Sequence, residues 1–214
     1  MRLARHVVIF AKAPRIGTVK RRLAASIGAL AAWRCYNEIT RGLIDRLARE
    51  SRWTLWLAVT PDRAARGTRH WPARHRRALR CIAQGPGDLG ARMGRVLRHL
   101  PRGPAVIVGS DIPEIDAPAI HAAFAALHSH AAVFGPADDG GYWLVGLRRR
   151  PPPRRHLPGR LFRQVRWSTE HALADTRAGL AKTTPTALLQ WLADVDDVES
   201  WRAWRARHAG PTGR

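Results

Sequence analysis

The chain has few cysteines and no long apolar run. Cys35 and Cys81 are the only cysteines among 214 residues, which excludes a disulfide framework and a thiol metal cluster. No apolar run approaches the roughly 20 residues that span a bilayer. Residues 1–10 hold too few apolar side chains before Lys12 to form the core of a signal peptide. These absences predict a protein of the reducing cytoplasm without a membrane span.

Lysine and acidic residues are scarce as well. The 37 Lys and Arg residues outnumber the 16 Asp and Glu residues, for a formal net charge of +21, and lysine occurs only at Lys12, Lys20 and Lys182. Such a charge suits nucleic acid or an acidic substrate. The arginines are scattered, however, as in the runs 74–77 and 148–150, without the basic-aromatic interleaving of RNA-binding sheets. This pattern favours a solvated surface over a specific nucleic-acid interface.

Strand and helix patterns alternate, which predicts one three-layer α/β domain with a largely parallel sheet. The predicted strands are 6–10, 53–59, 79–83, 105–108, 131–134 and 142–147. The predicted helices are 19–50 with a break near Gly28, 89–100 after an Asp88 cap, 117–128, one capped by Ser168 or Thr169, and 198–207. We expect a single domain over 1–208, a surface excursion over 148–158 and a loose tail over 209–214. The oligomeric state has no signature in the sequence.

The most informative segment is 105–113. Its four apolar residues, 105–108, predict a short strand buried on both faces of a parallel sheet, and they end abruptly in Gly109-Ser110-Asp111-Ile112-Pro113. Ligands of open α/β sheets bind just beyond the carboxyl ends of such strands, and Pro113 stiffens the turn. We therefore predict that Asp111 holds a metal against a phosphate and organises the chemistry.

A basic loop follows the first predicted strand and opens a helix, over residues 12–23. Backbone N–H groups at a helix start, flanked by Lys and Arg side chains, predict a phosphate cradle. The glycine spacing and the Lys-Ser/Thr pair of a Walker A loop are absent, and so is a dinucleotide fingerprint. The alternative is a basic loop that only turns the chain.

Two further segments combine glycines with acidic residues. In 85–93, Asp88 and Gly90 lie at another strand-to-helix junction, where glycines permit close approach of a ligand and where Asp88 alternatively caps the helix. In 135–143, Asp139 precedes a double glycine between two strands, which indicates either a ligand-binding loop or a simple hairpin turn.

The last acidic segment is Asp194-Val195-Asp196-Asp197. Alternation in an extended segment places Asp194 and Asp196 on the same side, where their oxygens could complete a hard-cation site. The alternative is a loop in which Asp197 caps the final helix.

In this order, these segments resemble a bacterial family of GT-A-like proteins assigned as glycosyltransferases, some of them associated with arsenosugar biosynthesis. They are more distantly similar to 2-phospholactate guanylyltransferases and other nucleotidylyltransferases. The resemblance is carried by residues 10–23, 84–93, 109–113, 135–147, 167–169 and 193–196. The chain departs from the family pattern at Lys20-Arg21-Arg22-Leu23, where Lys-Thr-Arg-Leu is usual, and at 197–200, where Thr-Pro-Glu-Asp is usual. Gly109-Ser110-Asp111 also differs from the Asp-x-Asp motif of many glycosyltransferases.

The resemblance implies a nucleotide-diphospho-sugar transferase fold (GT-A, Rossmann-like), with a mostly parallel mixed sheet, and a divalent cation, Mg²⁺ or Mn²⁺. The residues that we expect to bind the nucleotide are Lys12, Arg15, Gly17, Lys20, Arg22, Asp88 and Gly90. The expected metal ligands are Asp111, Asp194 and Asp196. The loop expected to face the acceptor or sugar is formed by Asp139, Gly140, Gly141 and Tyr142. The expected catalytic residues are Asp111, Asp139 and Lys20.

The predicted function is metal-dependent transfer from an activated nucleotide to a small-molecule acceptor. A nucleotide-sugar donor makes this a glycosyltransferase that releases a nucleoside diphosphate. A nucleoside triphosphate makes it a nucleotidylyltransferase, with attack at the α-phosphate and release of pyrophosphate. Asp139 and His121 are both available as a general base. A basic nucleic-acid-binding protein is the third alternative, and the acidic residues at strand ends argue against it.

Overall fold

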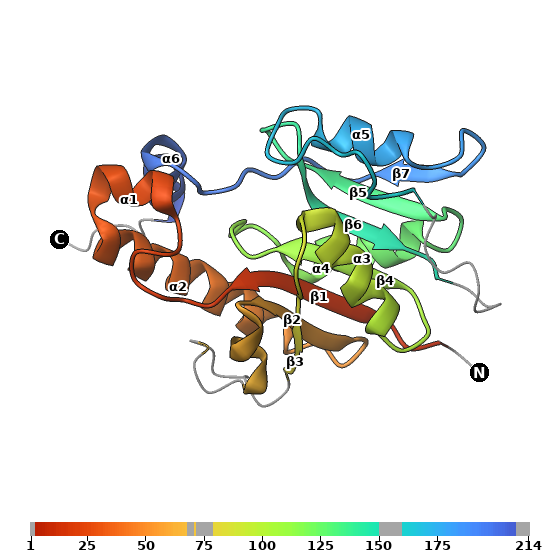
Figure 1. Cartoon of the computed structure of the whole chain (residues 1–214), viewed down its shortest axis with the longest axis horizontal. Coiled ribbons are helices and arrows are strands. Elements are labelled where there is room, and N and C mark those ends of the chain that lie inside the picture. Colours follow the sequence, from red (N-terminus) through yellow and green to blue (C-terminus); the bar gives the residue numbers. More distant parts are fainter. Residues whose placement is uncertain (1–2, 68–70, 72–78, 150–159, 209–214) are drawn as a thin grey trace.

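The computed structural model describes residues 3–67, 71, 79–149 and 160–208, and its centre is a seven-stranded sheet (Figure 1). The strands are β1 (His6–Lys12), β2 (Thr54–Thr60), β3 (Arg80–Ala83), β4 (Ala105–Gly109), β5 (Ala132–Pro136), β6 (Tyr142–Leu147) and β7 (Thr186–Leu188). The helices are α1 (Arg21–Ile27), α2 (Ala29–Leu47), the 3-10 helix η1 (Asp62–Arg66), α3 (Leu89–His99), α4 (Ala117–Ala126), α5 (Ala172–Ala178) and α6 (Val198–His208).

The sheet is mixed and mostly parallel, in the order β3-β2-β1-β4-β6-β5-β7. Strand β1 pairs in parallel with β2 and β4, β2 with β3, and β5 with β7. Only β6 among these strands runs against its neighbours, β4 and β5. The carboxyl ends of the other strands therefore meet at one edge. The predicted fold class is confirmed.

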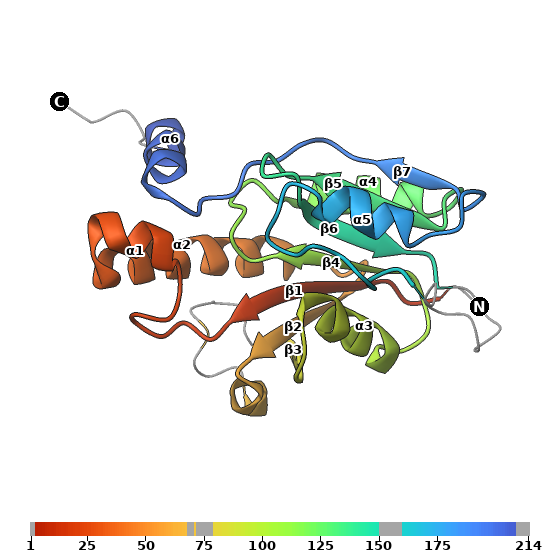
Figure 2. The same ribbon diagram turned by 45° about the horizontal axis from the view of Figure 1, so that its top comes forward.

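Helices cover both faces of the sheet and make three layers (Figures 1 and 2). Val7 and Ile9 of β1 pack in the same core cluster as side chains of α2 and α4, whereas the intervening Val8 packs with side chains of α3. This split arises because successive side chains of a strand point to opposite faces. The run 105–108 is buried throughout, as an apolar strand covered on both sides must be.

The local signals for helix ends are largely confirmed. Gly28, with φ 84°, separates α1 from α2 at the predicted break, because glycine accepts this left-handed region without a steric penalty. Asp88 caps α3 by accepting a hydrogen bond from the amide of Ala91. The helix predicted to be capped by Ser168 or Thr169 instead has His171 as its N-cap residue and begins at Ala172. The short strand β7 was not predicted.

The predicted surface excursion over 148–158 is wrong at its start. Arg149 is buried, and its guanidinium donates to the carbonyls of Leu100, at 2.9 Å, and Gly103, at 3.2 Å. The first of these bonds satisfies the carbonyl of Leu100, at the end of α3, which has no partner within the helix. The rest of this excursion, the run 74–77 and the tail 209–214 lie outside the described residues.

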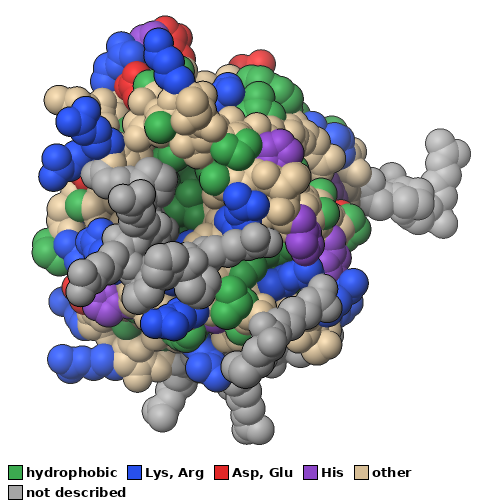
Figure 3. Space-filling view, turned by 90° about the vertical axis from the view of Figure 1, so that its right-hand side faces the viewer, with side chains coloured by type: hydrophobic (Ala, Val, Ile, Leu, Met, Phe, Trp, Pro, Cys, Tyr) green, Lys and Arg blue, Asp and Glu red, His purple; other side chains and the backbone are tan. Residues whose placement is uncertain are grey.

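The positively charged side chains are scattered over the surface, as the sequence predicts. On the face opposite the carboxyl ends of the parallel strands, Lys and Arg side chains are dispersed among hydrophobic, His and uncharged groups (Figure 3). Within the described ranges, no helix combines the length and the apolar character that a membrane crossing requires. Cys35 is buried, Cys81 is half-buried, and both are free thiols. The cytoplasmic location stays a prediction.

Candidate functional site

A cleft of about 800 Å³ opens at the carboxyl edge of the parallel strands. Its walls include Lys12 at the end of β1, Thr60 at the end of β2, Gln84 just after β3 and Ser110 just after β4. In Figures 1 and 2 the arrowhead of β1 points toward α1, which lies beside α6 at this side of the molecule. This is the position at which open α/β sheets bind ligands.

Four aspartates from separate segments line the cleft. Asp111 follows β4, Asp139 lies in the turn between β5 and β6, and Asp194 and Asp196 lie between β7 and α6. The segments are joined locally, because the amide of Val195 donates to the carbonyl of Asp111 at 3.1 Å. Folding thus brings the three predicted metal ligands to the same cavity, although more than eighty positions separate Asp111 from the other two.

Burial and, after it, repulsion by neighbouring carboxylates perturb the pKa of one carboxyl in this cluster. The pKa of Asp194 is raised from 3.8 to about 6, first by burial and then by the negative charge of Asp111, with smaller contributions from Asp139 and Asp196. Burial and like charges both disfavour the ionised form. A carboxyl with a shifted pKa in a cleft is typical of functional sites, and a bound cation would relieve the repulsion.

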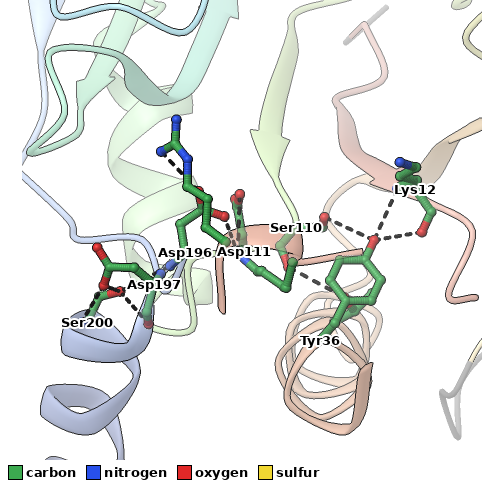
Figure 4. Close-up of polar contacts among 10 residues, drawn as sticks. Lys12, Tyr36, Ser110, Asp111, Asp196, Asp197 and Ser200 are labelled. Atoms are coloured by element: carbon green, nitrogen blue, oxygen red, sulfur yellow. Dashed lines mark hydrogen bonds and ion pairs between the residues drawn. The ribbon is translucent and has the colours of Figure 1, made fainter. Parts of the chain in front are cut away.

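Lys20 lies between two of these carboxylates. Its Nζ is 3.6 Å from Oδ2 of Asp111 and 3.5 Å from Oδ1 of Asp196. The Lys20 side chain is only 3% exposed, whereas the two carboxylates are 39% and 38% exposed. On the outer side, the exposed guanidinium of Arg22 approaches Oδ2 of Asp196 at 3.4 Å. Figure 4 shows Asp111 and Asp196 directed toward each other at the centre of these contacts.

The start of α1 places Lys20 in this position. Lys20 is the residue before the helix, with left-handed φ 48° and ψ 50°, and its carbonyl accepts the first helical bond from Ala24. This backbone region is unfavourable for a residue with a Cβ. Such outliers persist where the surrounding structure holds them, and they are concentrated at functional sites.

Tyr36 of α2 fixes the loop that leads to Lys20. Its hydroxyl donates to the carbonyl of Lys12 at 2.7 Å, accepts from the amide of Lys12 at 3.0 Å and lies 3.4 Å from Oγ of Ser110 (Figure 4). Burial raises the pKa of Tyr36 to about 12. Tyr36 was not predicted from the sequence as a site residue, because an aromatic side chain on the apolar stripe of a helix is most often part of the core.

Residues 167–169 form another part of the cleft wall, and the sequence indicated them only as a helix start and through the family resemblance. Trp167 packs edge-on to Tyr142, with ring centroids 6.4 Å apart, and Ser168 has a left-handed φ of 62°. Both line the cleft with Thr169. Arg166 anchors the segment to α5 through paired 2.9 Å bonds to the carboxylate of Asp175.

Most of the predicted site residues lie in the cleft. Those that line it are Lys12, Lys20, Arg22, Asp111, Asp139, Gly141, Tyr142, Asp194 and Asp196. Arg15 and Gly17 lie in the same basic loop as exposed residues that are not part of the lining.

Three further predicted residues have structural roles outside the lining. Asp88 caps α3. A Cβ on Gly90 would collide with Phe162 and Trp167, and one on Gly140 would collide with the backbone of Glu170. These two glycines permit close packing behind the wall, and ligand contacts by all three residues stay predictions.

Two segments have the purely structural role that the sequence offered as an alternative, a hairpin turn and a helix cap, and each also contributes a residue to the cleft. Residues 138–141 do form the β5–β6 turn, in which Oδ1 of Asp139 accepts from the amide of Gly141 at 2.9 Å. Asp197 does cap the last helix by accepting from the amide of Ser200 at 2.8 Å (Figure 4). A turn and a cap therefore position the neighbouring Asp139 and Asp196 at the cavity.

His121 is not part of the cleft lining. It lies on α4, where its ring packs 5.0 Å from that of Trp53 and its Nε2 is 3.5 Å from a carboxylate oxygen of Glu50. Of the two residues that the sequence offers as a general base, Asp139 alone lines the cavity.

The donor set at the cleft is made of carboxylate oxygens, which suits the hard cations Mg²⁺ and Mn²⁺ better than softer metals. In the described part of the chain, no three His, Cys, Asp or Glu residues are grouped as ligands of one ion. The carboxylates of Asp111 and Asp196 are instead bridged by the ammonium of Lys20. The chemistry of these carboxylates therefore fits a divalent cation, although the ammonium of Lys20 lies between two of them, Asp111 and Asp196.

Comparison with known families gives one match, over residues 43–169, to the model of a family described as "Uncharacterized protein conserved in bacteria (DUF2064)". The match extends over more than half of the chain, from α2 to Thr169. No curated protein matches the chain.

Solved structures share the fold. A proposed nucleotide-diphospho-sugar transferase from Desulfovibrio desulfuricans G20 is 24% identical, with a TM-score of 0.79 over 98% of this chain and 90% of that one. The 4-diphosphocytidyl-2C-methyl-D-erythritol synthase from Anaerococcus prevotii is 9% identical, with a TM-score of 0.60 over 97% and 99%. The manganese complex of Rv0371C from Mycobacterium tuberculosis H37Rv is 14% identical, with a TM-score of 0.53 over 94% and 97%.

Proposed function

This chain belongs to the DUF2064 family of bacterial proteins, and from that premise we propose that it is a metal-dependent glycosyltransferase with a nucleotide-sugar donor. The observation that carries the proposal is the cleft itself. Four aspartates and a buried lysine meet at the carboxyl edge of a parallel sheet, in a cavity of about 800 Å³. This volume is within the range of small-molecule sites.

The basic loop is the part that we assign to the donor phosphates. Lys12, Lys20 and Arg22 line the cleft from that loop, and Arg15 and Gly17 belong to the same segment. Charge-assisted hydrogen bonds from Lys and Arg bind phosphate oxygens strongly. They also offset the negative charge that develops on a leaving nucleoside diphosphate.

The opposite side of the cleft is the part that we assign to the acceptor. Asp139, Gly141 and Tyr142 line it, and the hydrogen bond from the amide of Gly141 orients the Asp139 carboxylate. An oriented carboxylate is a suitable base for removing the proton of an acceptor hydroxyl. We therefore assign this role to Asp139.

Asp111, Asp194 and Asp196 are the residues that would hold Mg²⁺ or Mn²⁺. The raised pKa of Asp194 supports this assignment, because burial and the neighbouring carboxylates disfavour the negative charge of Asp194, which a bound cation would stabilise. A manganese complex of a protein with the same fold adds support. When bound, such an ion supplies Lewis-acid stabilisation of negative charge on the diphosphate.

A nucleotidylyltransferase is the second candidate. The density of cations in the basic loop favours it, because a triphosphate carries more charge than a diphosphate sugar. The fold likeness to a diphosphocytidyl-methylerythritol synthase points the same way. The two candidates differ in their products, since the first releases a nucleoside diphosphate and the second releases pyrophosphate.

A thermal-shift panel of nucleotide sugars, nucleoside diphosphates and triphosphates, with and without Mn²⁺, tests the proposal. A ligand at a hundredfold excess over Kd adds about 2.7 kcal/mol of stability, or roughly 5 to 11 °C in Tm for a chain of this length. We expect this shift to need Mn²⁺ and to disappear in Asp111→Asn. Asp138→Asn is the matched control, because it removes the same charge from an exposed residue outside the lining. Equal shifts in the two variants would exclude Asp111 from the metal site.

A further inference from the structure

The ammonium of Lys20 is buried without a hydrogen-bond acceptor among the described residues. Its Nζ stands 3.5 to 3.6 Å from two carboxylates and so offsets part of their negative charge, but it forms no hydrogen bond with any of the described residues. A buried donor that lacks an acceptor is unfavourable. The Lys20 ammonium therefore retains its full capacity to bind a stronger acceptor.

Phosphate oxygens are such acceptors, and they would reach Lys20 from the cleft that its side chain lines. Lys20 is far more enclosed than the neighbouring Arg22, since the side chain of Lys20 is 3% exposed and that of Arg22 is 77% exposed. A buried ammonium keeps its strength as an electrostatic partner because solvent screens it little. Lys20 is thus placed to exchange carboxylates for phosphates.

Lys20 also lies between Asp111 and Asp196, two of the residues that would hold a divalent cation. Two cations that share the same pair of carboxylates repel each other, so the Lys20 ammonium opposes metal binding as long as it stays between them. If the ammonium moves to a phosphate, both carboxylates are released. The left-handed backbone of Lys20 at the start of α1 is the fixed point from which the side chain reaches either partner.

We propose that Lys20 is an exchangeable internal cation that makes the binding of metal and of nucleotide depend on each other. Without nucleotide, its ammonium pairs with Asp111 and Asp196 and keeps the affinity for a divalent cation low. With nucleotide, the ammonium binds the phosphates and the two carboxylates take the metal. This inference rests on the proposed metal and nucleotide sites and adds the residue that couples them.

Binding of Mn²⁺ alone, followed by the electron paramagnetic resonance signal of the free ion, tests the coupling. Lys20→Met removes the charge and keeps a long side chain, and Lys182→Met makes the same substitution at an exposed residue outside the cleft. Allosteric couplings are typically roughly 5- to 150-fold, so we expect Lys20→Met to bind Mn²⁺ tighter than wild type by a factor in that range. We expect Lys182→Met to equal wild type. Equal or weaker binding by Lys20→Met would overturn the inference.

The second arm adds UDP, GDP, CDP and ADP in turn. In wild type and Lys182→Met, the nucleotide that binds should raise the affinity for Mn²⁺, and in Lys20→Met this rise should shrink. Lys20→Gly removes the same charge, and glycine adopts the left-handed backbone conformation without strain. Like Lys20→Met, it should bind Mn²⁺ more tightly than wild type. An undiminished rise in either variant would also contradict the coupling.

Asp111→Asn separates this inference from the proposed function. If it removes Mn²⁺ binding while Lys20→Met brings no gain, the metal site stands and the coupling role of Lys20 fails. If Asp111→Asn leaves Mn²⁺ binding unchanged, the metal assignment itself fails. A gain in Lys20→Met that persists when Asp111→Asn is added would overturn the inference, because the extra binding would not involve the carboxylates that Lys20 bridges.

Discussion

Replacing Asp194 by Asn should stabilise the protein at neutral pH. The pKa of Asp194 is raised from 3.8 to about 6, chiefly by burial and then by the charge of Asp111. The folded state therefore binds this proton more tightly than the unfolded state does. The favourable contribution of the protonated carboxyl is complete below about pH 4 and is lost as the pH rises through 6. Above that range, the ionised carboxylate destabilises the fold.

The size of the effect follows from the shift. Each pKa unit corresponds to about 1.36 kcal/mol, so two units amount to roughly 3 kcal/mol for a carboxyl out of contact with solvent. Asp194 is only half-buried, and solvent screening reduces the figure to about 1 to 2 kcal/mol. For a chain of this length, that corresponds to roughly 2 to 8 °C in Tm. Asp194→Asn keeps the shape and abolishes the charge, so the variant should gain this amount at pH 8.

Urea denaturation of both proteins at intervals from pH 4 to pH 8, without divalent cations, measures the difference. The curves should converge near pH 4, separate between pH 4 and 6, and stay parallel above pH 7. Asp138→Asn, an exposed residue of the β5–β6 turn, should change stability by no more than about 0.5 kcal/mol throughout. A variant no more stable than wild type at pH 8 would refute the view that burial and the neighbouring carboxylates disfavour the ionised form of Asp194.

Two further predictions concern the supports of the site. Tyr36→Phe removes the hydroxyl that bonds both backbone groups of Lys12, so it should destabilise the fold by about 1 to 3 kcal/mol in urea denaturation, and unchanged stability would show that water replaces the hydroxyl. Gly140→Ala should lower stability by more than Gly17→Ala. Both glycines have φ near 78° (78° and 77°), but an added Cβ collides with the backbone of Glu170 at the first position and meets open space at the second. Equal losses in calorimetric unfolding would mean that backbone strain alone decides the cost, roughly 1 to 2 kcal/mol.

The elements and the fold class are largely encoded in local sequence. The run 105–108 is apolar at every position because helices cover both faces of β4, and the sequence shows this directly. Gly28 and Asp88 mark a helix break and a helix start by their own backbone and side-chain chemistry. The strand β7 was not predicted, because a segment of three residues is too short to show a periodicity. It forms a strand because it pairs with β5.

The sequence by itself also determined which acidic and basic segments would meet. Parallel strands align their carboxyl ends at one edge, so the sequence placed the residues after β1 and β4 at the same edge of the sheet, and the structure shows that the two strands are neighbours. The alternation of Asp194 and Asp196 likewise predicted two carboxylates on one side of an extended segment. Neither argument required knowledge of the distances between these residues.

Only the tertiary structure decided how the charges pair. The ion pairs of Lys20 with Asp111 and Asp196 join residues that are about 90 and 176 positions apart in the chain, and no local rule relates such positions. The same holds for the Tyr36 hydroxyl, whose partners lie on two other segments, and for the buried Arg149, which a run of arginines gave no reason to expect. Local sequence sets which groups are available, whereas burial and long-range packing set their distances, their hydration and therefore their electrostatic roles.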